Sequence, residues 1–142
     1  MRLKNIPGKK QNFKFNFNHY PDVAQTIACV SVGLNTNGEL TGLETLRIKE
    51  TDRISALEVE LKKCGADVAV IENGLAIKSN DAKPSTNPTI ATYNDHRMAM
   101  SFAPLAAIFG SIHIQNPEVV VKSYPSFWND LKNAGFGVDL QP

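Results

Sequence analysis

Cationic side chains gather where helices are expected to begin, although helix N-termini carry partial positive charge and normally prefer acidic residues. The cations are Lys49, Arg53, His96, Arg97 and Lys122. Each such placement is unfavourable by roughly a few tenths of a kcal/mol unless an anion offsets it. Unpaired backbone N–H groups at the same helix ends also favour anions. The pattern therefore predicts that several helix N-termini converge on a strongly anionic ligand.

A second interpretation of these cations needs no ligand. Lys49 would pair with Asp52, and Arg97 with Asp95, as solvated surface ion pairs that contribute little to stability. This interpretation suits any single cation, whereas several cations at matched positions of the chain favour the anion site.

The candidate acids and bases are four carboxylates: Asp22, Glu50, Asp52 and Asp95. Asp22 and Asp95 each stand where an N-cap is expected, and capping is the plain interpretation of both. Glu50 lies between two cations, where a carboxylate stays ionised and can exchange a proton with a bound substrate. Because Thr51 or Asp52 can cap the helix, Glu50 is left free for chemistry.

Hydrophobic spacing predicts the helices and strands that position these residues. Phe13, Phe15 and Phe17 alternate with polar residues, which is typical of a strand. Further strands are predicted over 40–46, 67–71, 75–79 and 111–115, with another beginning at 138, and helices over about 21–38, 50–63, 93–109 and 125–134. Asn73-Gly74 predicts a hairpin turn between two of the strands. The predicted fold class is therefore α/β.

The spacing of key residues repeats along the chain. Asp22 lies 27 positions before Lys49, and Asp95 lies 27 positions before Lys122. Each lysine precedes a helix that ends in Gly-x-x-Val, at 65–68 and at 135–138. The sequence thus predicts, after a leader at 1–12, two copies of a helix–strand–helix–strand unit, at about 13–79 and about 89–142.

Composition excludes several classes of function. The formal net charge of +1 gives no reason to expect nucleic acid or membrane lipid as a partner. No signal segment follows the basic N-terminus, so we expect a cytoplasmic protein. Cys29 and Cys64 are expected as buried, reduced thiols, with a disulfide as the alternative. The histidines do not cluster with cysteines, which argues against a structural zinc site.

Two motifs resemble the paired signature of the EPSP synthases (3-phosphoshikimate 1-carboxyvinyltransferases). Residues 49–53 read Lys-Glu-Thr-Asp-Arg, and residues 93–100 read Tyr-Asn-Asp-His-Arg-Met-Ala-Met. Pro-Asp at 21–22 and Lys-Ser-Tyr-Pro at 122–125 fit the same family in the same order. The similarity runs from about residue 13 to the end of the chain.

The resemblance implies transfer of the enolpyruvyl group of phosphoenolpyruvate to the 5-hydroxyl of shikimate 3-phosphate, with release of phosphate. This is a step of the shikimate pathway to chorismate and the aromatic amino acids, and the family uses no metal or organic cofactor. The family fold has two domains, each of three βαβαββ units, with helix N-termini facing the cleft between them. By this likeness the chain holds about two of the three units of the C-terminal domain.

The resemblance also implies residue roles. Asp22 and Lys49 would contact the attacking hydroxyl, and Glu50 would exchange a proton with the enolpyruvyl methylene carbon. Arg53, Arg97 and Lys122 would bind phosphoenolpyruvate, with Asp95 and His96 in support. One departure is Thr45, which stands where many members have an asparagine that binds shikimate and which has a shorter side chain.

Further ligand-binding residues of this family lie outside these 142 residues. We therefore expect a folded chain that is inactive alone, completes its site with the N-terminal domain of the same enzyme, and tends to self-associate. Two rivals are a related transferase acting on UDP-N-acetylglucosamine, which lacks the 49–53 motif, and a non-catalytic anion-binding module. The presence of Glu50 argues against the module, because binding alone needs no proton-transfer carboxylate.

Overall fold

The computed structural model describes residues 12–49, 51–78 and 87–139. Its strands are β1 (Phe13–Asn16), β2 (Gly38–Thr41), β3 (Asp67–Ile71), β4 (Gly74–Lys78), β5 (Thr89–Ile90) and β6 (His113–Ile114). Its α-helices are α1 (Ala24–Gly33), α2 (Arg53–Lys63), α3 (His96–Phe102), α4 (Ala106–Phe109) and α5 (Phe127–Asn133). Four 3-10 helices connect them: η1 (Pro21–Val23), η2 (Glu44–Ile48), η3 (Ala103–Leu105) and η4 (Pro117–Lys122).

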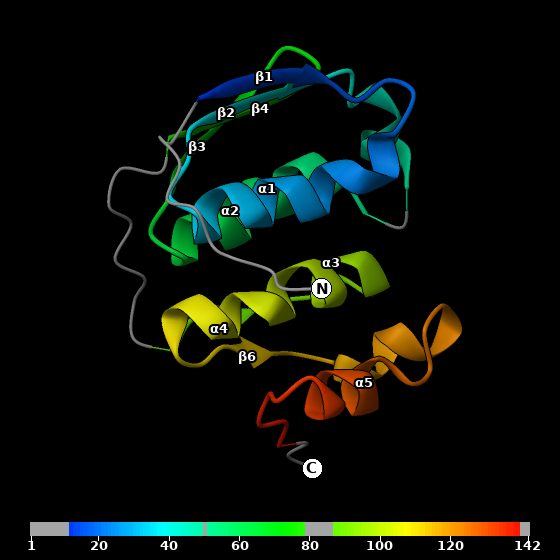
Figure 1. Ribbon diagram of the computed structural model, residues 1–142. Coiled ribbons are helices and arrows are strands. Elements are labelled where there is room, and N and C mark those ends of the chain that lie inside the picture. The colour runs from blue at the N-terminus through cyan, green and yellow to red at the C-terminus, as the bar shows by residue number, and fades with distance from the viewer. Residues whose placement is uncertain (1–11, 50, 79–86, 140–142) are drawn as a thin grey trace, which may run out of the picture.

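The first half of the chain forms a sheet of four strands in the order β1-β2-β4-β3, with α1 and α2 against one face (Figure 1). β1 and β2 are parallel and are joined through α1, while β4 is antiparallel to β2 and to β3. The element order is therefore β-α-β-α-β-β, as the sequence and the family resemblance predicted. The fold class is confirmed.

The predicted hairpin joins β3 to β4. Asn73 adopts a left-handed backbone (φ 56°), which asparagine tolerates better than most residues. Gly74 then starts β4 with its Cα close to β2, because a Cβ added there would lie 2.0 Å from the carbonyl oxygen of Leu40. The Asn-Gly pair thus satisfies two separate needs, a turn and a close approach of two strands.

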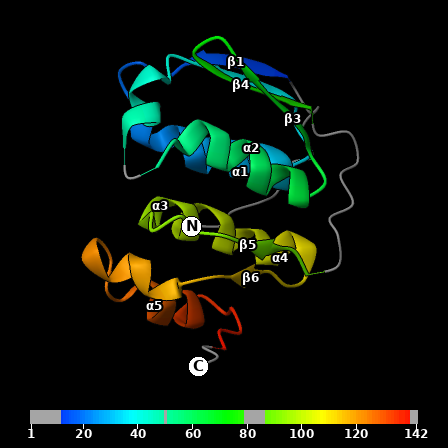
Figure 2. The ribbon, with the colours of Figure 1, turned by 180° about the vertical axis from the view of Figure 1, so that it is seen from behind.

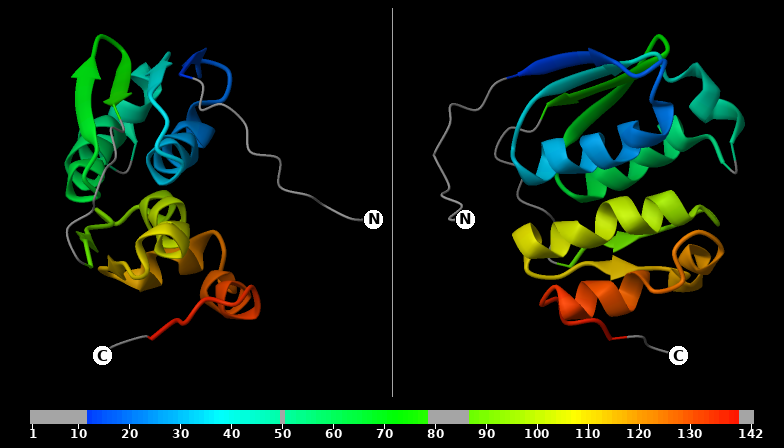
Figure 3. Two further views of the ribbon diagram at one scale, coloured as in Figure 1. Left: turned by 60° about the vertical axis from the view of Figure 1, so that its left-hand side comes forward. Right: turned by 45° about the vertical axis from the view of Figure 1, so that its right-hand side comes forward.

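The second half repeats the strand–helix–strand arrangement. β5 and β6 are parallel and are joined through α3, η3 and α4. Figure 3 shows α1 and α2 side by side beneath the large sheet, with α3 below them. β6 and α5 lie on the side of α3 that faces away from α1 (Figures 1 and 2).

One hydrophobic core joins the two halves. Met98 and Phe102 of α3 are fully buried in the same cluster as Ala28 and Val32 of α1. Close helix contact is assisted by a hydrogen bond between the hydroxyls of Thr26 and Ser101 (3.2 Å). A smaller cluster holds η4 and α5 against α3 and consists of Ala99, Ala103, Val120 and Phe127. This packing fixes the start of α3 relative to the starts of α1 and α2.

Several predicted boundaries are wrong in the early part of the chain. The helix expected to close near Gly38 ends at Gly33, because Asn35 turns the chain with a positive φ of 54° and Gly38 belongs to β2. The strand expected over 40–46 stops at Thr41, because Gly42 has a φ of 71° and a 3-10 helix follows.

The later boundaries also need correction. The helix expected over 93–109 begins at His96, because Tyr93 and Asn94 have positive φ and Asp95 is the N-cap. It is interrupted by η3 at Pro104, which lacks the N–H that an α-helix requires. α5 starts at Phe127 with Ser126 as its N-cap, so Pro125 lies outside it. Val138 is not in a strand, and the continuation of that expected strand at 140 lies outside the described residues.

Both cysteines are buried free thiols, as expected, and the alternative of a disulfide is wrong. Cys29 lies in α1 and Cys64 caps the C-terminus of α2. Within the parts of the chain that the structure describes, no helix has the length and hydrophobicity needed to cross a membrane.

Candidate active site

The elements that carry the candidate residues meet along one side of the molecule. η1, η2, η4 and the starts of α1, α2 and α3 all lie on the right-hand side of Figure 1. η1 packs against η2, and α3 packs against η4. The starts of α1, α2 and α3 therefore lie together, as predicted, whereas the expectation of a helix start at Lys122 is wrong, because Lys122 ends η4 and α5 begins only at Phe127.

Asp22 links two arginines from different helices. Its Oδ1 accepts a hydrogen bond from Nη1 of Arg53 (3.2 Å), and its Oδ2 accepts one from Nη2 of Arg97 (3.1 Å). Arg97 also donates through Nη1 to the backbone oxygen of Asp22 (3.3 Å). Asp22 makes no side-chain cap for η1, so its interpretation as an N-cap is wrong. The carboxylate instead holds the two guanidinium groups together.

Arg53 is almost fully buried, with only 2 % of its side chain exposed, and forms a two-point ion pair with Asp95. Nε of Arg53 donates to Oδ2 of Asp95 (2.5 Å), and Nη2 donates to Oδ1 (3.3 Å). Asp95, with no exposed surface, also caps α3 by accepting from the backbone N–H of Arg97 (2.9 Å). The predicted N-cap at Asp95 is confirmed. The surface pair expected between the Arg97 and Asp95 side chains is replaced by Arg97–Asp22 and Arg53–Asp95 pairs.

Asp52 is the N-cap of α2, one of the two residues expected for that role. It accepts from the backbone N–H groups of Ile54 (3.1 Å) and Ser55 (3.2 Å). Burial raises the pKa of Asp52, but hydrogen bonds from Ser55 and Ile54 and the charge of Arg47 outweigh burial and place this pKa below its ordinary value. The ion-pair partner of Asp52 is Arg47 (3.3 Å), not Lys49.

The other predicted site residues surround this network. Lys49 follows η2 directly and is exposed, as is Thr45 within η2. Lys122 is exposed at the end of η4, and His96 is half-buried at the first position of α3. Glu50 lies outside the described residues. No group of three or more His, Cys, Asp or Glu residues that could hold a metal ion is found among the residues described.

Sequence reasoning missed a second buried carboxylate on α2, the helix that carries Arg53. Glu60 of α2 has no exposed surface and accepts hydrogen bonds from the hydroxyl of Tyr93 (2.8 Å), the backbone N–H of Ala91 (3.1 Å) and the ammonium of Lys63 (2.6 Å). A signal was present, because Glu60 lies beside Leu57 and Leu61 in the apolar stripe of its helix. A charge in such a stripe is expected to be buried and paired.

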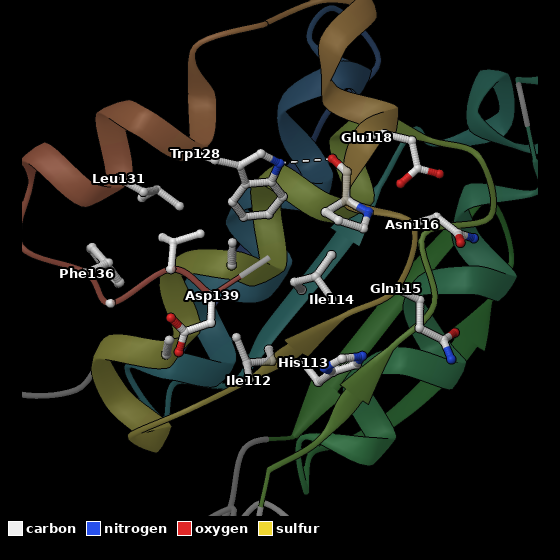
Figure 4. A pocket seen from close by; sticks show the side chains of 15 residues that line it. Ile112, His113, Ile114, Gln115, Asn116, Glu118, Trp128, Leu131, Phe136 and Asp139 are labelled. Carbon is white, nitrogen blue, oxygen red and sulfur yellow. Dashed lines mark hydrogen bonds between the residues drawn. The ribbon is translucent and has the colours of Figure 1, made fainter. Parts of the chain in front are cut away.

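A hollow in the described part of the molecule lies away from these charged groups. It has a volume of about 670 Å³ and lies between β6, α5 and the chain that follows α5. In Figure 4 the side chains of Ile114, Trp128 and Leu131 face it, with Trp128 donating to the backbone oxygen of Pro117 (2.9 Å). None of the predicted site residues lines it. We place the candidate site at the Asp22 network, because that is where the charged groups converge.

Comparisons with known proteins agree with the motifs. Residues 2–131 match the family model described as EPSP synthase (3-phosphoshikimate 1-carboxyvinyltransferase). A 3-phosphoshikimate 1-carboxyvinyltransferase of Bacteroides fragilis is 44 % identical over 143 residues, covering 99 % of this chain and 34 % of the relative. The corresponding protein of Haemophilus influenzae is 36 % identical over 117 residues, covering 82 % of this chain and 27 % of the relative.

Comparison with solved structures also finds EPSP synthases. An EPSP synthase of Acinetobacter baumannii superposes with a TM-score of 0.73 at 28 % sequence identity, over 83 % of this chain and 28 % of that one. The chain spans about a third of the length of the curated relatives it matches. With the family model covering most of its residues, the chain belongs to the EPSP synthase family.

Proposed function

We propose that this chain contributes part of the active site of an enzyme that transfers the enolpyruvyl group of phosphoenolpyruvate to the 5-hydroxyl of shikimate 3-phosphate. The observation that carries the proposal is the bridge from Asp22 to the guanidinium groups of Arg53 and Arg97. This bridge places a carboxylate and two cations at converging helix starts. Such a set can hold an anionic substrate beside a group that accepts a hydroxyl proton.

In the proposed mechanism Asp22 and Lys49 bind the attacking hydroxyl. The Asp22 side chain is 47 % exposed, so one face of the carboxylate is open to a ligand while both oxygens contact arginine. Lys49 is exposed directly after η2, which packs against the η1 helix of Asp22, and would stabilise the developing negative charge. Glu50 exchanges the proton with the methylene carbon, a role that rests on its place in the family motif.

Arg97 and Lys122 bind the carboxylate and phosphate of phosphoenolpyruvate in this proposal. Arg97 has 35 % of its side chain exposed, and Lys122 lies on η4, which packs against α3. Arg53 is far less accessible, and its hydrogen bonds to Asp22 and Asp95 support a role in orienting those carboxylates as well as the expected contact with the substrate. His96 and Asp95 support Arg97 from the first turn of α3.

We further propose that residues 13–79 and 89–142 are two repeat units of one domain, and that the N-terminal domain of the same enzyme supplies the rest of the site. The exposed apolar side chains of Phe15, Tyr20 and Val23 support this, because they line a groove of about 380 Å³ at the edge strand β1. Such a patch favours burial against another protein surface. The chain alone is then inactive and self-associates, and the complete enzyme acts in the cytoplasm without metal or cofactor.

The rival proposal is a binding module without catalysis. It explains the pairing of Asp22 with both arginines equally well, because in a binding module this carboxylate would only orient the two cations. The two proposals differ at Glu50, which a binding module does not need. They are separated by measuring turnover as well as affinity.

The test is a chimera in which this chain replaces the matching segment of the Bacteroides fragilis relative. We expect phosphate release from phosphoenolpyruvate and shikimate 3-phosphate by the chimera, and none by the chain alone. Glu50→Gln in the chimera should abolish turnover while phosphoenolpyruvate still binds. Unchanged turnover in Glu50→Gln would exclude the proton-transfer role. A folded chimera that binds phosphoenolpyruvate but releases no phosphate would favour the binding module.

A further inference from the structure

We infer that Glu60 and Tyr93 position the substrate-binding arginine Arg97, although neither residue belongs to the charged network of the site. Glu60 lies in α2 and Tyr93 precedes α3, so their contact joins the two helices whose starts meet at the site. The inference rests on the proposed function for its substrate, phosphoenolpyruvate, and on geometry alone for the positions of the side chains.

One face of α2 makes the contacts with the segment before α3. Arg53 and Glu60 are seven residues apart on α2, and residues with this spacing lie on the same face of a helix. Arg53 binds Asp95, while Glu60 binds the backbone N–H of Ala91 and the hydroxyl of Tyr93. α2 therefore holds the segment from 91 to 95 at both of its ends. Figure 2 shows this connection between β5 and α3 lying beside α2.

The backbone of that segment has an unusual conformation. Tyr93 and Asn94 both have left-handed conformations, with φ values of 54° and 58°. Asparagine adopts this conformation readily, but a bulky residue such as tyrosine rarely does. Backbone of this kind persists where surrounding contacts fix it. The hydrogen bond from the Tyr93 hydroxyl to Glu60 is the side-chain contact that holds the strained residue.

The turn at 92–95 leads directly into the cap of α3 and to Arg97. The backbone N–H of Asp95 donates to the carbonyl oxygen of Thr92 (2.9 Å), which closes the turn. Asp95 then caps α3, and Arg97 extends from the first turn of that helix to Asp22. The turn at Tyr93 therefore sets the positions of Asp95 and Arg97 relative to α2 together with the Arg53–Asp95 pair.

Glu60 is well suited to this task because it cannot turn toward solvent. Its carboxylate has no exposed surface, and Lys63 balances its charge while also donating to the carbonyl oxygen of Thr89 in β5 (3.1 Å). A buried carboxylate with every partner in place is rigid, since the loss of any partner leaves a buried polar group unsatisfied. Glu60 and Tyr93 are thus positioning residues that act through the turn before α3.

The first test uses the chain itself and needs no substrate. The Nε–Hε NMR signals of Arg53 and Arg97 report the geometry of the charged network. We expect Tyr93→Phe and Glu60→Gln to shift both signals. The matched control is Glu58→Gln, which removes the surface pair with Lys62 (2.8 Å) on the same helix and should leave both signals in place. Unchanged arginine signals in a folded Tyr93→Phe variant would overturn the inference.

The second test measures kinetics in the chimera. Misplacing a binding group by about 1 Å can cost up to about 100-fold, so we expect Tyr93→Phe to raise KM for phosphoenolpyruvate by about 10-fold to 100-fold. All constants of Glu58→Gln should stay within about twofold, because its surface pair with Lys62 lies outside the charged network. A lower Tm with unchanged KM would show a purely structural role. If the unaltered chimera does not turn over, the proposed function fails, and the arginine signals alone decide the positioning role.

Discussion

Arg53 and Asp95 form a buried, two-point ion pair that joins α2 to the cap of α3 across 42 positions of the chain. The pair stands next to Asp22, whose carboxylate completes the network but remains partly exposed. The two carboxylates therefore differ in environment although both contact the same guanidinium. Asp95 has a structural task, and Asp22 is accessible to a ligand.

This difference predicts unequal effects of two matched substitutions. Asp95→Asn keeps an N-cap but leaves Arg53 without its main counter-charge, and breaking a buried pair costs about 3–5 kcal/mol. Asp22→Asn leaves Arg53 paired with Asp95 and should cost at most about 1 kcal/mol. Urea unfolding of both variants measures the difference. Equal losses of stability would contradict the assignment of separate tasks.

The cap of α2 gives a prediction about pH. Asp52→Ala removes two hydrogen bonds to backbone N–H groups and should lower the free energy of unfolding by about 1 kcal/mol. Because the pKa of Asp52 is lower in the folded chain than its ordinary value of 3.8, its ionisation stabilises the fold above that value. The contribution is lost as the pH falls through the folded-state pKa.

Asp52→Asn is the matched control, because asparagine caps equally well but does not ionise. The difference in unfolding free energy between the unaltered chain and Asp52→Asn should shrink toward zero below the folded-state pKa. Denaturant unfolding at a series of acidic pH values measures it. A difference that stays constant down to the lowest pH would exclude Asp52 as the titrating group.

Much of the fold follows from the sequence because its signals are local. The alternation of Phe13 and Phe15 predicts β1 and Asn73 predicts the hairpin. The interpretation of Asp52 and Asp95 as N-caps holds, although the expected helix ranges began about three residues too early. These features depend on a few neighbouring residues. The motif at 49–53 likewise predicts the family without any knowledge of the fold.

The remaining features depend on contacts between distant segments. No local pattern shows that Arg53 is buried, because its partner Asp95 comes from another helix. The early end of β2 depends on Gly42, whose left-handed backbone brings it close to Asn16 and Asn18 at the end of β1. The role of Glu60 depends on Tyr93, 33 positions away. Site geometry of this kind is decided by tertiary packing, which charge spacing does not encode.

Gln25 provides a prediction about stability. It lies in α1 with no exposed surface, and neither its Oε1 nor its Nε2 has a hydrogen-bond partner among the described residues. Burying an amide without hydrogen bonds costs about 1–3 kcal/mol, so Gln25→Met, which is similar in length and apolar, should stabilise the chain by about 1–2 kcal/mol. Thermal and urea unfolding measure the gain.

Gln25→Glu is the comparison for that prediction. A buried charge in the same place should destabilise the chain by more than the amide does, because desolvating a carboxylate is far more costly. A destabilised Gln25→Met together with a tolerated Gln25→Glu would show that this position is polar and solvated.

The reactivity of the two buried cysteines reports whether the core excludes solvent and reagents. Burial, and next the charge of Cys64, raise the pKa of the Cys29 thiol well above its usual value. Burial and then the charge of Glu60 raise the pKa of Cys64 to about 12, against a smaller opposing effect of Lys63.

Because the thiolate is the reactive form, both thiols should resist a disulfide reagent at pH 8 in the folded chain and react when it unfolds. Absorbance of the released thiolate, with Cys29→Ala and Cys64→Ala to assign each reaction, measures this. Rapid reaction of the native chain at Cys64 would show that the end of α2, and with it the Glu60 contact to Tyr93, opens far more often than the buried geometry allows.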